Sequence, residues 1–342
     1  MANVLQQIDE RLSEWVSAQG PAFVAAAPAS ASEPVEVDIL SSPDTLELTG
    51  PRSIRVALGG ESPVRASLEE NGRIVVMLCA FAGGPRTVRF HGSASVADGF
   101  ADVTVERIAD SCGFVVPKLD LQSRDSERLG SAGPPETPSE LDERLAGWIS
   151  EQHLFFVASA PAGPDGHVNL SPKGAMDSLA VLGPTSIGYV DFFGSGIETV
   201  AHIKENGRLT MMLCGLGTDG AVLRLSGRGR VLEIDDPDWA AMRPRFGLAQ
   251  AKEKAERSIV LLDVGRVEHS EAALPAYRYV AEREQLFRSA DNRIRKQGPD
   301  AIRAYCRVNN DQSIDGLRGV SPSSKQPTPE ERAALAHEGR KL

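Results

Sequence analysis

The chain repeats one stretch of its own sequence at a nearly constant offset. Residues 9–28 recur 133 positions later as residues 142–161, and both stretches begin with Asp-Glu-Arg-Leu. The match resumes at an offset of 135, where Glu70–Arg73 and Glu205–Arg208 both read Glu-Asn-Gly-Arg. A repeat of this length exceeds the period of roughly 20–50 residues found in solenoid proteins, so it indicates a duplicated domain. The question of function therefore becomes which copy has kept its chemistry.

Length and charge limit the classes of protein to which this chain can belong. At 342 residues it has room for about two domains, each with a hydrophobic core of its own. The formal net charge of −10 argues against nucleic acid or an anionic membrane surface as the main partner, because both require a basic face. A small-molecule substrate is the expected partner, and a local basic pocket is compatible with the acidic average.

The sequence also predicts a soluble, cytoplasmic protein with reduced thiols. The N-terminal residues lack a basic segment followed by an apolar one, and no apolar run approaches the ~20 residues of a membrane span. The four cysteines form no CxxC pair, so neither a disulfide framework nor a zinc site is expected. These cysteines are Cys79, Cys112, Cys214 and Cys306.

Four regions follow from the repeat and from changes in composition. Residues 1–129 form the first copy. Residues 130–138 are rich in Gly and Pro and form a linker that continues neither a helix nor a strand. Residues 139–319 form the second copy. Residues 320–342 form a polar tail interrupted by prolines, which we expect to be mobile.

The second copy has the pattern of short strands with a few helices. A helix capped by Ser139 is expected first, a short helix over residues 197–205 ends at Asn206-Gly207, and a longer helix covers residues 239–257. Short strands joined mostly as a meander predict a mainly β fold with α (α+β), in which each copy forms a small antiparallel barrel. The predicted strands cover residues 154–160, 168–170, 187–191, 209–214, 222–232 and 259–264.

Two segments of the second copy carry residues that suit a phosphate group. Residues 166–174 form a strand that ends in Ser-Pro-Lys-Gly, and residues 191–199 run through Gly-Ser-Gly into a helix start. Free N–H groups, hydroxyls and one lysine supply the donors and the positive charge that an organic phosphate needs. An ordinary turn with an exposed lysine is the alternative for the first segment taken alone. A Rossmann motif is disfavoured, because Thr199 occupies the position of its third glycine.

Five motifs of the second copy occur together and in order. They are Ser171–Gly174, Gly194–Thr199, Glu205–Arg208, Met212–Cys214 and Ser313–Leu317. On these motifs the second copy resembles, over essentially its whole length, the pyridoxamine 5'-phosphate oxidase-like flavoproteins with a split β-barrel fold. The resemblance implies two tandem split β-barrels that form an intramolecular pseudo-dimer with FMN at the interface. It implies little about the substrate, because the family includes oxidases, reductases and proteins with no known reaction.

The first copy departs from this pattern. At the lysine segment it has Ser41–Asp44, with Asp44 where the cation is expected, and an aspartate there opposes phosphate binding. Its helix start, Gly59–Val64, is two residues shorter and contains a proline, which removes an N–H donor. It keeps an Asp-Ser-Cys-Gly-Phe segment, Asp110–Phe114, which the second copy lacks. This complementary loss predicts one composite site per chain.

The predicted site joins the two copies across their interface. The second copy supplies the phosphate site, and Asp110–Phe114 of the first copy lies near the flavin ring or the substrate. No catalytic residue and no metal ligand is assigned. The residues expected to bind FMN are Ser171, Lys173, Gly194, Ser195, Gly196, Glu198, Thr199, Ser111, Cys112 and Gly113.

Three other groups of residues have structural explanations. Cys112 is expected to pack or hydrogen-bond, since no His adjoins it in the sequence, and a nucleophilic or redox-active thiol is the alternative. Arg224, Arg228 and Arg230 share one strand face by the period of two, and they either bind an anion or form a solvated face. His202 is expected on the surface of the helix that follows the Gly-Ser-Gly turn.

The function expected from the resemblance is that of an FMN-dependent oxidoreductase of the pyridoxamine-phosphate-oxidase-like type. It would act on an unidentified small molecule by hydride transfer at flavin N5. Two alternatives remain open: a haem or deazaflavin ligand on the same fold, and a non-catalytic flavin-binding or scaffold protein. The sequence is also compatible with further pairing of the fused pseudo-dimer as a homodimer.

Overall fold

The structure is a computed structural model that describes residues 3–41, 45–59, 62–123, 135–217, 220–271 and 274–320. The first half, within residues 3–123, contains β1 (Asn3–Leu5), α1 (Glu10–Ser17), β2 (Ala22–Ala26), β3 (Glu36–Leu40), β4 (Leu46–Gly50), β5 (Ser53–Ala57), α2 (Val64–Asn71), β6 (Arg73–Cys79), β7 (Thr87–Ala97), β8 (Phe100–Ser111) and β9 (Lys118–Ser123). The second half, within residues 135–320, contains α3 (Glu143–Ser150), β10 (Phe155–Ser159), β11 (Asn169–Lys173), β12 (Leu179–Gly183), β13 (Ser186–Phe192), α4 (Glu198–Asn206), β14 (Arg208–Cys214), β15 (Ala221–Glu233), α5 (Trp239–Met242), β16 (Glu256–Glu271), β17 (Ala276–Ala281), α6 (Gln285–Gln297) and α7 (Ala301–Asn309).

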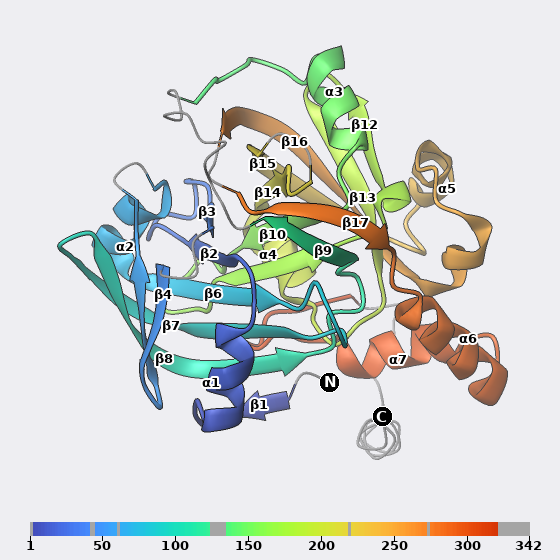
Figure 1. The fold of residues 1–342 in the computed structure, drawn as a ribbon. Coiled ribbons are helices and arrows are strands. Elements are labelled where there is room, and N and C mark those ends of the chain that lie inside the picture. Colours follow the sequence, from blue (N-terminus) through green and yellow to red (C-terminus); the bar gives the residue numbers. More distant parts are fainter. Residues whose placement is uncertain are drawn as a thin grey trace.

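The two halves have the same sheet topology. The first sheet has the strand order β3-β2-β6-β7-β8-β5-β4, with β1 added beside β8, and the second has the order β11-β10-β14-β15-β16-β13-β12 (Figure 1). All neighbouring strands are antiparallel. The predicted fold class, mainly β with α and built from two tandem split β-barrels, is confirmed. The second half differs by its additions, α5 between β15 and β16 and the pair α6 and α7 after β17.

The central strands of each half are apolar on both faces, and this explains how the halves pack. In β2, Val24 faces the core of the first half, whereas Phe23 and Ala25 face a second core that both halves share. Successive side chains of a strand point to opposite faces, so such a strand has no polar side to offer to water. Phe23 and its repeat counterpart Phe156 meet in this shared core with ring centroids 4.0 Å apart. The shared core also contains Val75, Met77, Ala158, Leu170, Met212 and Cys214.

Reciprocal polar contacts reinforce the shared core. Arg73 donates to the carbonyl of Gly163 at 2.6 Å, and its repeat counterpart Arg208 donates to the carbonyl of Ser30 at 2.8 Å. Each arginine thus ties its own half to the other in the same way. β9 of the first half and β17 of the second also pair as a two-stranded sheet. The halves therefore form an intramolecular pseudo-dimer.

The helix ends follow local sequence, with two corrections. Helices α2 and α4 both end at a glycine in the left-handed region, Gly72 and Gly207, as expected for the second. Helix α3 is capped by Asp142, not by Ser139 as predicted, because its carboxylate accepts the N–H of Leu145. The long helix predicted over residues 239–257 is also wrong. The segment forms α5 and two 3-10 helices, over residues 243–245 and 250–255, and Pro244 and Gly247 lie where the regular helix is lost.

Two of the predicted regions fall mainly outside the described residues. These are most of the linker, up to residue 134, and the tail beyond residue 320. At the end of the linker, Glu136 forms a β-bridge with His269 of β16, so this part of the connection is held to the second half. No helix among the described residues has the length and apolar character needed to cross a membrane.

The shared core makes one prediction about stability. Replacing Phe156 by Ala removes a fully buried ring that contacts Phe23, and it should lower the free energy of unfolding by about 3–5 kcal/mol in denaturant titrations. Phe100→Ala is the control, because the ring of Phe100 is 42% exposed, and its effect should stay below about 1 kcal/mol. Equal losses for the two variants would contradict a core shared between the halves.

Candidate functional site

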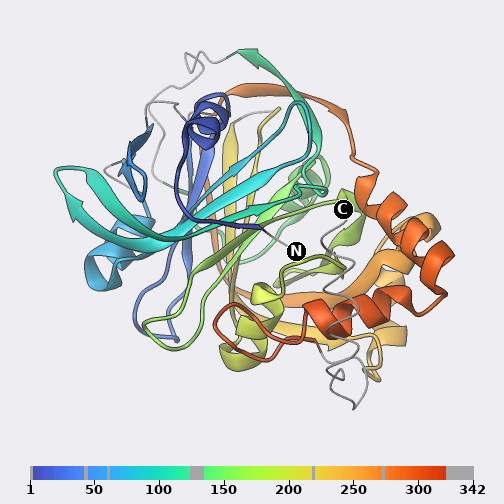
Figure 2. The ribbon, with the colours of Figure 1, turned by 90° about the horizontal axis from the view of Figure 1, so that it is seen from below.

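A cavity of about 1140 Å³ lies between the two halves. The first half lines it with β7, β8 and the loop that follows β8, and the second half lines it with β11, β13 and the start of α4. Helices α6 and α7 complete the wall; in Figures 1 and 2 they lie beside the second half, far from α2. All ten residues predicted to bind the cofactor line this cavity. Residues of both copies therefore line one cavity.

A buried ion cluster lies behind the Ser-Pro-Lys-Gly segment. Lys173 on β11 donates to one oxygen of Asp191 on β13 at 2.6 Å, and Arg257 on β16 donates to the other at 2.5 Å. Asp191 and Arg257 are each 4% exposed. Burial alone would raise the pKa of Asp191, but Arg257 and Lys173 outweigh it and hold this pKa below its ordinary value. Burial also lowers the pKa of Lys173, although Asp191 opposes this shift.

This cluster changes the expected role of Lys173. The lysine is not a free point charge, because Asp191 neutralises one of the two cations in the cluster. One net positive charge is left, spread over Lys173 and Arg257. It lies beside the cavity that both residues line. An anion in the cavity would meet this shared charge instead of an isolated ammonium group.

Hydrogen bonds to its backbone carbonyl groups hold the Gly-Ser-Gly turn before α4 in place. The carbonyl of Gly194 accepts from Asn310 at 2.9 Å, and that of Gly196 accepts from Arg257 at 2.7 Å. Because the peptide unit is planar and trans, the N–H that follows each carbonyl points the opposite way. One of these, the N–H of Ile197, donates to the side chain of Glu198 at 2.9 Å. The carboxylate of Glu198 thus occupies one N–H group at the start of α4, and it would compete with an incoming anion for that donor.

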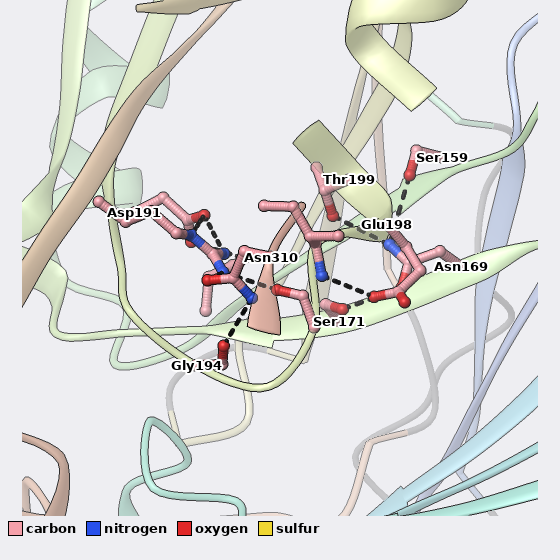
Figure 3. A network of polar contacts seen from close by, with 12 residues as sticks. Ser159, Asn169, Ser171, Asp191, Gly194, Glu198, Thr199 and Asn310 are labelled. Atoms are coloured by element: carbon pink, nitrogen blue, oxygen red, sulfur yellow. Dashed lines mark hydrogen bonds and ion pairs between the residues drawn. The ribbon is translucent and has the colours of Figure 1, made fainter. Parts of the chain in front are cut away.

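Asn169 organises the hydroxyl groups of the site. Its amide donates to Thr199 Oγ1 at 2.9 Å and to Ser159 Oγ at 3.3 Å, while its carbonyl accepts from Ser171 Oγ at 3.0 Å (Figure 3). Ser171 therefore uses its proton inside the protein. Thr199 accepts from Asn169 and keeps its proton for another partner. Between Ser171 and Thr199, it is therefore Thr199 that is able to donate into the cavity.

The first half supplies an arginine that the sequence analysis did not include. Arg89 on β7 crosses the interface and donates to the carbonyl of Leu170 at 2.6 Å and to Ser171 Oγ at 3.5 Å. It also donates to Ser111 Oγ at 3.2 Å. Burial lowers the pKa of its guanidinium. Arg107 on β8 lines the same cavity, and its buried Nε has no hydrogen-bond partner. The repeat contained a signal for Arg89, since Arg224 is its counterpart at an offset of 135.

The side chains of the segment Asp110–Phe114 in the first half do not all face the cavity. Ser111, Cys112 and Gly113 line the cavity, and Cys112 is exposed. Asp110 turns to Arg86 instead, with an ion pair of 2.8 Å. Asp110 is thus not among the lining residues, contrary to its expected place near the ring or substrate.

The strand register identifies the true counterparts of the site in the first half. β3 pairs with β2 as β11 pairs with β10, which places Asp38 at the position of Ser171 and Leu40 at the position of Lys173. The comparison of Asp44 with Lys173 is therefore wrong, and Asp44 itself lies outside the described residues. In the same way, Leu58 occupies the position of Asp191, next to the end of β5. The ion cluster has no equivalent among these residues.

Carboxylates fill the corresponding position at the other side of the interface. Arg224, the counterpart of Arg89, donates to Asp38 at 2.5 Å and to the carbonyl of Val37 at 2.7 Å. Arg266, the counterpart of Arg107, forms an ion pair of 2.8 Å with Glu36. Arg89 donates to the hydroxyls of Ser111 and Ser171 in the cavity, whereas its counterpart Arg224 has an acidic partner.

Two further predictions about side chains need correction. Arg224 does not share a face with Arg228 and Arg230, which are exposed. A register shift between Ser226 and Gly227 breaks the period of two along β15. His202 is not on a helix surface: it is completely buried beside Ser159, and burial lowers its pKa to about 4.

Comparisons with known proteins give a family match for part of the chain. The sequence profile described as Pyridoxamine 5'-phosphate oxidase matches residues 141–271. A "Pyridoxamine 5'-phosphate oxidase family protein ustO" from Aspergillus flavus is 41% identical over 131 residues, which are 38% of this chain and 51% of that protein. Residues 141–271 are thus similar to the pyridoxamine 5'-phosphate oxidase family. The chain spans about half the length of the relative from A. flavus.

Solved structures with this family name are more distant. A putative pyridoxamine 5'-phosphate oxidase from Lactobacillus delbrueckii is 21% identical and covers 40% of this chain and 98% of that one, with a TM-score of 0.29. A pyridoxamine 5'-phosphate oxidase-related, FMN-binding protein from Nostoc punctiforme is 12% identical and covers 34% and 74%, with a TM-score of 0.27. The assignment to the family therefore depends on the sequence match, and the fold on the strand order.

The ion cluster predicts a large effect of one neutral substitution. Asp191→Asn leaves Lys173 and Arg257 buried without a carboxylate, and it should lower the free energy of unfolding at pH 7 by about 3–5 kcal/mol. The loss should shrink as the pH falls below ~4, where the carboxylate of the unfolded wild type is already protonated. Denaturant titrations of Asp102→Asn give the control, because this exposed partner of Arg55 should change stability much less.

The buried histidine predicts a pH dependence of stability. The pKa of His202 is about 4 in the folded protein and ordinarily 6.5, so the unfolded chain binds more protons between these values. Stability contributed by neutral His202 is present above about pH 6.5 and is lost as the pH falls towards about 4. In denaturant titrations over this range, His202→Gln should show a smaller pH slope than the wild type. Parallel slopes would refute this account of His202.

Proposed function

We propose that the cavity binds FMN and that this protein is an FMN-dependent oxidoreductase acting on a small molecule. The observation that carries the proposal is the convergence of residues from both halves on one positively charged cavity. The match of residues 141–271 to the profile of the pyridoxamine 5'-phosphate oxidase family supports the same ligand class. The proposal assigns one site to each chain, because acidic side chains fill the corresponding position.

Charge supports an anionic ligand. Seven lysine or arginine residues line the cavity against three acidic ones, although the whole chain carries a net charge of −10. A positively charged cavity in an otherwise acidic protein attracts and retains anions. Its volume of about 1140 Å³ slightly exceeds the ~300–1,000 Å³ usual for small-molecule sites, which is compatible with a cofactor and a substrate together.

The residues divide the work as their hydrogen bonds allow. Thr199 has a free proton for a phosphate oxygen, and Arg89 and the Lys173–Asp191–Arg257 cluster supply positive charge. Asn169 keeps Ser171 and Thr199 in place. FMN, when bound, would supply the ring nitrogen N5 that accepts or returns a hydride. Cys112 and the faces of α6 and α7 that line the cavity remain for the substrate.

The first test is an absorption spectrum of the purified protein with the released cofactor quantified per chain. We expect the two bands of oxidised FMN and about one FMN per chain. Two per chain would overturn the assignment of a single site. A sharp Soret band would identify haem, and a single band near the violet would identify a deazaflavin. No bound chromophore after addition of FMN would overturn the proposal.

The repeat offers a matched pair of variants. Arg89→Met should weaken FMN binding by about 1.5–3 kcal/mol, the range expected for hydrogen bonds to a charged group, as measured by quenching of flavin fluorescence. Arg224→Met removes the counterpart at the other position, and it should leave the dissociation constant for FMN unchanged. Equal weakening by the two variants would contradict the choice of site.

A further inference from the structure

The Ser-Ile-Asp-Gly-Leu motif lines the cavity with Ile314, but its Asp315 does not line the cavity. It forms the tip of a hairpin over residues 310–319, which we call the C-terminal hairpin. Gln312 and Arg318 form a β-bridge, and the N–H of Gly319 donates to the carbonyl of Asp311 at 2.8 Å. At the tip, the N–H of Ser313 donates to the carbonyl of Leu317 at 2.9 Å. The motif is therefore a tight turn that projects Asp315.

The tip of the C-terminal hairpin binds the segment that leads into β11. One oxygen of Asp315 lies 2.6 Å from His167 Nδ1, and the other accepts the backbone N–H of His167 at 3.0 Å. His167 precedes Asn169 by two residues, and Asn169 holds the hydroxyls of Ser171 and Thr199. The contact at the tip thus holds the residues just before β11, the strand that carries Ser171 and Lys173 of the proposed phosphate site.

The base of the C-terminal hairpin binds the Gly-Ser-Gly turn and helix α4. Asn310 is completely buried, donates to the carbonyl of Gly194 and accepts from Arg257 at 3.0 Å. Gly319 packs against it so closely that a Cβ atom would lie 2.1 Å from the carbonyl oxygen of Asn310. Lys204 of α4 also donates to the carbonyl of Gly319 at 2.8 Å. The base is therefore clamped to the turn and the helix that form the anion-binding end of the cavity.

We propose that Asp315 is a positioning residue: through the C-terminal hairpin it fixes the spacing between β11 and the start of α4. One segment of the site lies on β11 and the other on the turn and the start of α4, and this hairpin is bonded to the residues before β11 and to the turn. The inference rests on the proposed function for its ligand, since the spacing is that of the proposed phosphate site. Among the described residues, the first half has no such hairpin after β9.

The contact at the tip depends on charge. The hydrogen bond that His167 donates to Asp315 raises the pKa of His167 against the opposing effect of burial. Glu106 and Arg107 of β8 act on the same ring with opposite signs. His91 of β7 lies edge to face with it at 5.7 Å, and burial lowers the pKa of His91 to about 3, so His91 is neutral near pH 7. The His167–Asp315 ion pair is therefore complete below about pH 6.5 and weakens as the pH rises through the raised pKa of His167.

The test compares Asp315→Asn with Asp300→Asn, a change of the same chemistry at an exposed position just before α7. Hydrogen exchange of the cofactor-free protein is measured first. Asp315→Asn should speed exchange in peptides that cover residues 192–199 as well as 310–319, and Asp300→Asn should not. The affinity for FMN is then measured at pH 6 and pH 8.5. Asp315→Asn should weaken it about tenfold at pH 6, a factor equal to one charged hydrogen bond of modest strength, and less at pH 8.5.

Each outcome decides one of the two proposals. Faster exchange confined to residues 310–319, or unchanged affinity at both pH values, would overturn the positioning role of Asp315. Failure of the wild type to bind FMN would overturn the proposed function alone, because the exchange measurement needs no ligand. Weakening by the same factor at both pH values would show that the charge of His167 plays no part, and it would overturn the ion-pair account.

Discussion

The arrangement of the molecule depends on strands that are apolar on both faces. β2, β6, β10 and β14 each place alternate side chains in the core of their own half and in the shared core, so neither half has a polar surface on that side. Burying both faces is the condition under which such strands are stable in water. The cavity lies along the boundary that this burial creates, between residues of β7, β8, β11 and β13. The cavity needs both halves, and the halves stay together because separating them would expose the apolar surface of the shared core.

The two sides of this boundary have diverged through charge. On one side, Arg89 crosses to a strand that offers hydroxyl and amide groups, Ser171 and Asn169. On the other, Arg224 crosses to Asp38 and Arg266 to Glu36. The same backbone frame therefore holds positive potential open to a ligand in one place and cancels it within the protein in the other. Only the first arrangement is suited to bind an anion.

Part of this arrangement could be predicted from the sequence. The repeat and the apolar strand segments gave the two sheets, and local motifs identified ten residues that line one cavity. Contacts between distant residues could not be found in this way. Asn310 reaches Gly194 across 116 positions, and Arg257 reaches Asp191 across 66. The sequence aligns Asp44 with Lys173 because both follow a serine and a proline, but strand pairing fixes the counterpart as Leu40. The sequence alone places His202 on a helix surface, since a single helix pattern does not show what packs against each face, but the side chain is buried.

The covalent connection between the halves has a consequence for how such a protein can change. In a symmetric homodimer, each substitution appears twice, once at each of two equivalent positions. An aspartate at the position of Ser171 would then remove both sites at once. Because the two halves lie on one chain, Asp38 and Ser171 can vary independently, and the position of Asp38 can hold an internal ion pair while that of Ser171 does not. In a fused chain, the residues on one side of the interface therefore need not bind a ligand, and their ion pairs can act only to hold the two halves together.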